Sequence, residues 1–131
     1  MSAFTREAAT GRVQAWFAQL DSSQLAISDW VVTEFSAALS IKLRMKQLSV
    51  EQRASAVGLF TNLRTRSLAV APVTREHFQA AARFADQSGL GLRAGDALHV
   101  AVAAELGATL CTLDKRLADA DVAFGVSAEL V

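Results

Sequence analysis

The sequence lacks several features that mark specialised classes of protein. It contains a single cysteine, Cys111, so no disulfide can form within the chain and no zinc cluster can be built on cysteines. It contains a single proline, and no linker, low-complexity tract or internal repeat interrupts it. We therefore expect one domain over residues 1–131, a length that can bury one substantial core.

Net charge and long apolar runs are absent as well. Thirteen basic and thirteen acidic residues cancel, so no global positive field indicates a nucleic-acid-binding protein, although a local basic rim remains compatible with neutrality. No apolar run approaches the roughly 20 residues of a membrane span, and the N-terminus has no signal-peptide core. We expect a cytoplasmic protein with no membrane segment. The 52% of hydrophobic residues is typical of a globular domain.

Short apolar segments alternate with longer amphipathic ones along the chain. Helical spacing predicts helices over residues 5–20, 28–46, 49–66, 74–89, 94–107 and 114–120. Apolar and β-branched runs predict strands over residues 24–28, 67–73, 108–113 and 122–126. Ser49 followed by Gln52 is a capping-box pattern. This alternation predicts an α/β domain with a mostly parallel sheet.

Glu34 is a carboxylate in apolar surroundings. It falls in the second turn of the helix that follows the first predicted strand, and its helical neighbours are Trp30, Val31, Ala37 and Ala38. An ionised carboxylate on an apolar face loses hydration, which costs on the order of several kcal/mol without compensation. We favour a ligand role over that of a surface glutamate at the edge of the apolar stripe.

Asp96 and Asp114 also follow predicted strands or open helices. Each residue, taken alone, fits the role of a helix cap as well as it fits the role of a metal ligand. Ligands of parallel sheets bind at the carboxyl ends of the strands, and that placement would bring Glu34, Asp96 and Asp114 to one rim. Carboxylates gathered in one pocket repel each other, and a divalent cation removes that repulsion. An all-oxygen site suits Mg²⁺ or Mn²⁺, which activates water and neutralises charge on a phosphodiester.

The other polar residues are assigned no role in the candidate site. Asp119 and Asp121 fall in a short helix and are expected to be solvated, and His77 is expected to be exposed. His99, one turn after Asp96, is interpreted as a neighbour of the site and not as a base. Cys111 lies between Leu110 and Thr112 and is expected to be a small core residue.

Three motifs in this order resemble the PIN domain of VapC-type toxins: "TEF", "RAGDALH" and "TLDKRLA". The resemblance runs from about Ala3 to Val126. It implies a three-layer sandwich around a mostly parallel central sheet flanked by helices. It also implies a metal-dependent endoribonuclease, the toxin of a type II toxin–antitoxin pair.

The family's acidic cluster corresponds to Glu34, Asp96 and Asp114, the same three carboxylates, which would be both catalytic and metal-binding. The threonine ahead of the late aspartate corresponds to Thr112, whose hydroxyl would hydrogen-bond a ligand or water. Arg93 corresponds to a position beside the acidic pocket, where a cation would meet a phosphate. The resemblance further implies Mg²⁺ or Mn²⁺ as cofactor, RNA as substrate, a cognate antitoxin protein as partner and a homodimer.

The family begins with an apolar strand that ends in an aspartate, and this chain starts at "MSAFTREA" without either. We interpret it as an N-terminally shortened PIN-like domain whose beginning has been lost. The alternative is a truly shortened member, a catalytically impaired PIN-like binding module that acts through antitoxin or RNA binding. A metal-dependent phosphatase or DNA nuclease that uses the same acids is a third possibility.

Overall fold

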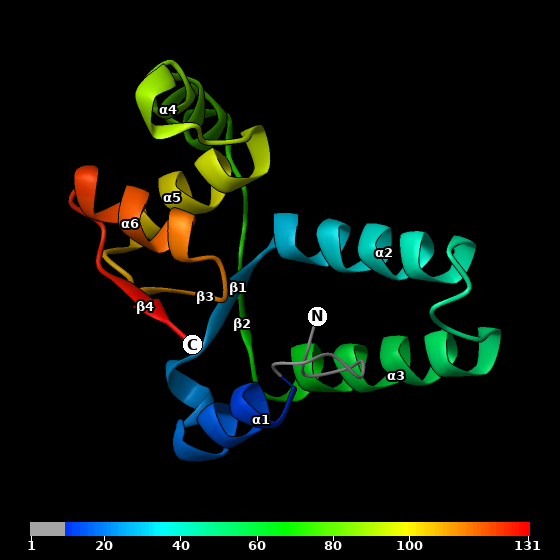
Figure 1. Ribbon diagram of the computed structural model, residues 1–131. Coiled ribbons are helices and arrows are strands. Elements are labelled where there is room, and N and C mark those ends of the chain that lie inside the picture. The colour runs from blue at the N-terminus through cyan, green and yellow to red at the C-terminus, as the bar shows by residue number, and fades with distance from the viewer. Residues whose placement is uncertain (1–9) are drawn as a thin grey trace. The chain divides into compact units, whose positions relative to one another are not determined.

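The computed structural model describes residues 10–131, and Figure 1 labels its helices and strands. The chain divides into two compact units, with the boundary between Ala71 and Pro72. Residues 5–9 of the first predicted helix and the whole "AFTREA" segment, residues 3–8, lie outside the described residues. Each unit holds its own pair of parallel strands.

The first unit combines helices with one strand pair. Its described elements are α1 (Thr10–Gln19), η1 (Ser22–Gln24), β1 (Ala26–Ser28), α2 (Asp29–Arg44), α3 (Val50–Arg66) and β2 (Ala69–Ala71). Strand β1 pairs with β2 in parallel, with Ile27 opposite Val70. Helices α2 and α3 run in opposite directions along each other (Figure 1).

The core of the first unit lies between α2 and α3. The rings of Phe35 and Phe60 stack with their centroids 4.1 Å apart, and Leu39 is fully buried beside them. Ile27 of β1 packs against the same cluster. Apolar burial of this kind stabilises a helix pair far more than intrinsic helix propensity does. Strand β1 and helix α2 are therefore held as one structure.

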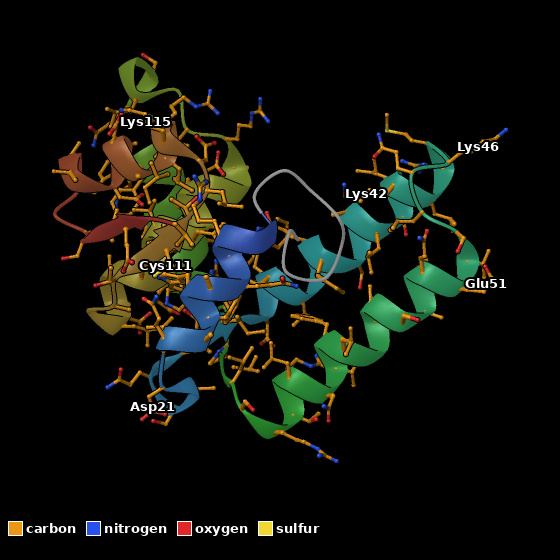
Figure 2. The ribbon with its side chains drawn as sticks, turned by 60° about the horizontal axis from the view of Figure 1, so that its bottom comes forward. Asp21, Lys42, Lys46, Glu51, Cys111 and Lys115 are labelled. Carbon is orange, nitrogen blue, oxygen red and sulfur yellow. The ribbon has the colours of Figure 1, made fainter. Side chains whose placement is uncertain are left out.

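The start of α3 has the capping box predicted from the sequence. The Ser49 hydroxyl accepts a hydrogen bond from the Gln52 N–H at 3.1 Å, and the Gln52 side chain accepts one from the Ser49 N–H at 2.8 Å. Lys46, in the turn before it, has a positive φ of 57°. Figure 2 shows Lys46 and Glu51 at this end of the helix pair. The prediction of the capping box is confirmed.

The second unit carries most of the apolar helix surface of the chain. Its elements are α4 (Arg75–Ala85), η2 (Ser88–Leu90), α5 (Ala94–Leu106), β3 (Leu110–Thr112), α6 (Lys115–Ala123) and β4 (Ala128–Leu130). Strand β3 pairs with β4 in parallel, with Cys111 opposite Glu129. Gly107 ends α5 with a φ of +59°, a left-handed conformation that glycine adopts without steric cost.

Helix α5 is buried along most of its length, as its apolar sequence predicts. Val100 and Ala103 pack with Leu117 of α6 and with Val126 in one buried cluster. The Phe84 and Phe124 rings lie against each other with centroids 4.4 Å apart. Helices α5 and α6 therefore present fixed faces to each other.

His77 is buried, so the expectation of an exposed histidine is wrong. Its Nδ1 accepts the Thr74 N–H at 2.9 Å in the capping box of α4, and its Nε2 contacts the Glu105 carboxylate of α5. Cys111 is exposed, so the expectation of a core cysteine is also wrong. Figure 2 labels Cys111. The neighbouring residues Leu110 and Thr112 did not determine which face of β3 the Cys111 side chain occupies.

The α/β class predicted from the sequence is confirmed, and both strand pairs are parallel. One element is wrong: residues 122–126 form no strand. Helix α6 continues to Ala123, the chain turns at Gly125 with a φ of +72°, and β4 follows. Among the described residues, no helix combines the length and the apolarity that crossing a membrane requires.

Replacing Ser49 with alanine removes the capping hydroxyl of α3. We expect Ser49→Ala to lower the free energy of unfolding by about 1 kcal/mol, because the Gln52 N–H loses its partner. Urea denaturation measures the change. Ser55→Ala, at an exposed position within the same helix, is the matched control and should not lower stability, since alanine has the higher helix propensity. Equal losses in both variants would contradict the capping role.

Candidate functional site

Glu34 lies in the second turn of α2, in the first unit. Its side chain is half-buried, next in sequence to the core residue Phe35. Strand β1 ends at Ser28, directly before this helix. The placement after a parallel strand, which the sequence predicted for Glu34, is therefore confirmed.

Asp96 is the third residue of α5, in the second unit. The N-cap of this helix is Arg93, whose backbone is extended and whose side chain makes no capping hydrogen bond. Asp96 therefore does not cap the helix, and the capping alternative for this residue is wrong. Its negative charge in the first turn still interacts favourably with the helix dipole. The carboxylate is half-buried, while Arg93 is exposed beside it in sequence.

Asp114 does cap a helix. Its Oδ1 accepts hydrogen bonds from the N–H groups of Arg116 at 2.9 Å and Leu117 at 3.3 Å, at the start of α6. Its Oδ2 lies 4.0 Å from the Arg116 guanidinium. The Thr112 hydroxyl accepts the Asp114 N–H at 3.0 Å. Thr112 thus fixes the backbone of Asp114, and Oδ1 is the carboxylate oxygen that accepts both capping hydrogen bonds.

Thr112 ends β3, so Asp114 stands at the carboxyl end of a parallel strand, as predicted. Asp96 and Asp114 belong to the second unit and Glu34 belongs to the first. The meeting of the three at one site stays a prediction. Within residues 10–131, no three His, Cys, Asp or Glu side chains are grouped so that they could hold a metal ion among them.

Asp121 is the acidic residue that the sequence reasoning placed wrongly. It was expected to be solvated, yet its exposed fraction is 0%. Neither oxygen of its carboxyl group has a hydrogen-bond partner among residues 10–131. A buried carboxyl without partners is costly in a native structure and calls for an explanation.

The electrostatics of Asp121 connect it to α5. Burial raises the pKa of Asp121 to about 6, the charge of Asp96 adds to this rise, and His99 opposes it. Burial is the largest of these causes, so the second unit contains a carboxyl group that is protonated more readily than an ordinary aspartate.

A signal for Asp121 was present in the sequence. Leu117, Ala120 and Asp121 are spaced as one face of a helix, and all three are buried. The same signal, an acid on an apolar stripe, was used to select Glu34. It was missed at Asp121 because the short helix that carries this residue was expected to be exposed to solvent.

The raised pKa of Asp121 predicts a specific pH dependence of stability. The folded chain keeps a proton on Asp121 that the unfolded chain has lost, so this group's cost to stability grows as pH rises from about 4 through about 6. With divalent cations removed by EDTA, Asp121→Asn should gain stability relative to the unmodified protein between about pH 5 and about pH 7.5. Urea denaturation at the two pH values measures the gain.

The control for this measurement is Asp119→Asn, on the same helix. Asp119 is exposed and pairs with Lys115 at 2.6 Å. Its stability relative to the unmodified protein should stay nearly constant over this pH range. A stability difference for Asp121→Asn that does not change with pH would show that the buried carboxyl does not titrate in this range.

Comparison with known proteins bears on what such acids do. No curated protein matches the chain. The PIN domain family matches residues 1–123, which include Glu34, Asp96, Asp114 and Asp121. The match therefore covers nearly the whole chain and both units. The chain belongs to the PIN domain family, whose members are generally metal-dependent nucleases.

Proposed function

We propose that the protein is a Mg²⁺- or Mn²⁺-dependent endoribonuclease, the toxin of a VapC-type toxin–antitoxin pair, which hydrolyses phosphodiester bonds of RNA. The observation that carries this proposal is the PIN domain match over residues 1–123. Asp96 and Asp114, each at the start of a helix in the second unit, support it, because carboxylate oxygens are the ligands that Mg²⁺ and Mn²⁺ prefer.

Glu34, Asp96 and Asp114 are the proposed ligands, directly or through water. When bound, the cation supplies activation of water and neutralisation of charge on the phosphodiester. The protein's own part is to fix the carboxylates. Asp114 is held by its two capping bonds and by the Thr112 hydroxyl beneath its backbone. Asp96 is held by the buried start of α5, where Ala97 and Leu98 follow it into the core.

Exposed arginines next to two of these acids support contact with a phosphate backbone. Arg93 precedes α5, and Arg116 lies within 4.0 Å of Asp114. A guanidinium can bind two phosphate oxygens at once. The positive charges of these two arginines would allow a protein with no net charge to bind RNA around its acidic site. Arg93 would hold substrate, and Thr112 would support Asp114.

Protein partners are also proposed, namely a cognate antitoxin and a second copy of this chain. Large apolar side chains of α2, α3 and the turn between them are exposed, among them Ile41, Met45, Val50 and Leu59. Exposed apolar side chains are available for contact with a protein partner. The motifs that resemble VapC-type toxins support the choice of an antitoxin as partner.

Asp96→Asn tests the proposed activity. We expect the variant to lose Mn²⁺-dependent cleavage of single-stranded RNA by more than about 100-fold, because the amide cannot replace an ionised ligand. Its fold should be retained, as judged by circular dichroism, since Arg93 and not Asp96 caps α5. Glu76→Gln, an exposed position on α4, is the control and should cleave normally.

The competing hypothesis of an impaired binding module makes a different prediction for the same assay. In that case the unmodified 131-residue chain would bind RNA or antitoxin but would not cut RNA with Mg²⁺ or Mn²⁺. Cleavage retained in Asp96→Asn would instead remove Asp96 from the catalytic site. Panels of RNA, DNA and phosphomonoester substrates separate a ribonuclease from a DNA nuclease or a phosphatase.

A further inference from the structure

Two cationic residues stand next to each other at the start of α6, and they have different partners. Lys115 pairs with Asp119 one turn further along the helix, with its Nζ 2.6 Å from the carboxylate. Arg116 approaches Asp114 instead, and its guanidinium lies 4.0 Å from Oδ2. The side chains of this second pair are 55% and 48% exposed, so solvent and ligands can reach both. Of the two cations, Arg116 is therefore the one that faces an acid of the candidate site.

The two oxygens of the Asp114 carboxylate have separate roles. Oδ1 accepts hydrogen bonds from the N–H groups of Arg116 at 2.9 Å and Leu117 at 3.3 Å. Oδ2 lies outside the cap and faces the Arg116 guanidinium. Arg116 thus donates its backbone N–H to one oxygen, while its side chain lies near the other. The guanidinium is the counter-ion of the oxygen that the cap does not use.

The contact between Arg116 and Asp114 is long. At 4.0 Å it is an ion pair and not a hydrogen bond, since hydrogen bonds of this kind have N–O distances of about 2.7–3.2 Å. Ion pairs between exposed side chains contribute little to stability, because water and salt screen the charges. A guanidinium also has several N–H donors, and this contact brings none of them within hydrogen-bond distance. The Arg116 side chain can therefore change its partner without disturbing the fold.

A divalent cation bound to Asp114 would compete with this guanidinium. Because Oδ1 serves the cap, Oδ2 is the oxygen that a cation can take. A cation at Oδ2 would repel Arg116, since like charges a few ångströms apart disfavour each other. The displaced guanidinium then needs another anion. Its planar set of donors fits two oxygens of a phosphate, and the backbone of the proposed RNA substrate supplies phosphates.

We propose that Arg116 exchanges one anion for another: without a cation it neutralises Oδ2 of Asp114, and with a cation bound there it holds a phosphate of the RNA backbone. The exchange couples the two binding steps, because Arg116 opposes the cation until a phosphate balances its charge. Lys115 has no such role, since Asp119 holds it. The inference rests on the proposed function in that it takes Asp114 as a ligand and RNA as the substrate.

Binding of Mn²⁺ to the full 131-residue chain without RNA tests the first half of the exchange. Electron paramagnetic resonance of free Mn²⁺ gives the Kd. Arg116→Gln should bind Mn²⁺ about three- to tenfold more tightly, because the competing positive charge is gone. Arg116→Lys keeps that charge and should stay within about twofold of the unmodified protein. Lys115→Gln, the matched control at the neighbouring cation, should also stay within about twofold.

Binding of RNA tests the second half. The probe is a fluorescently labelled single-stranded phosphorothioate RNA, which keeps the negative charge of the backbone and resists hydrolysis, and anisotropy gives the Kd. With Mn²⁺ present, Arg116→Gln should weaken RNA binding about fivefold or more and lower the salt dependence by roughly one phosphate contact. In EDTA the same substitution should change the Kd less than about twofold, because Arg116 is then engaged with Asp114.

The exchange predicts opposite effects of one substitution, so it is overturned by any of three results. These are unchanged or weaker Mn²⁺ binding in Arg116→Gln, a loss of RNA affinity that is equal in EDTA and in Mn²⁺, and no Mn²⁺ binding by the unmodified protein. Circular dichroism should show that Arg116→Gln keeps its fold, because the capping bond uses the backbone N–H of this residue and not its side chain.

Failure of this inference and failure of the proposed function look different. If Arg116→Gln shows both effects but the unmodified chain does not cut RNA, the exchange stands and the ribonuclease proposal fails. If the chain cuts RNA while Arg116→Gln behaves like Lys115→Gln in both binding measurements, the ribonuclease proposal stands. In that second case the pairing of Arg116 with Asp114 is an ordinary surface ion pair.

Discussion

The packing of α5 against α6 is the constraint on which the acidic region of the second unit depends. Val100 and Ala103 meet Leu117 and Val126 in one buried cluster. This contact buries Asp121, and burial is the main reason why the pKa of its carboxyl group is raised. Apolar burial supplies the free energy that holds this unfavourable acid in place.

The three acids chosen from the sequence have different structural roles. Asp114 is both a cap and a candidate ligand, because the two capping bonds use Oδ1 and leave Oδ2 outside the cap, 4.0 Å from the Arg116 guanidinium. Asp96 is not a cap, since Arg93 holds that position. Glu34 lies on α2 beside the core of the first unit. A carboxylate can cap a helix and also bind a ligand when capping uses only one of its two oxygens.

Much of this could be predicted from the sequence, for physical reasons. Ser49 and Gln52 determined the start of α3, because the capping box satisfies two backbone donors locally. The apolar run of α5 determined its burial. Cys111, His77 and Asp121 were misplaced because their environment depends on contacts distant in sequence: the face of β3, the packing of α4 on α5, and the burial of one face of α6. The meeting of Glu34 with Asp96 and Asp114 stays a prediction.

The central claim is that this PIN domain binds a divalent cation through Asp96 at the start of α5. The anomalous scattering of Mn²⁺ in crystals of the full chain, recorded near the manganese absorption edge, tests this claim most directly. We predict a peak within about 2.0–2.6 Å of an oxygen of Asp96, a distance typical of hard cations with carboxylates. A peak bound by other residues only, or no peak, would contradict it.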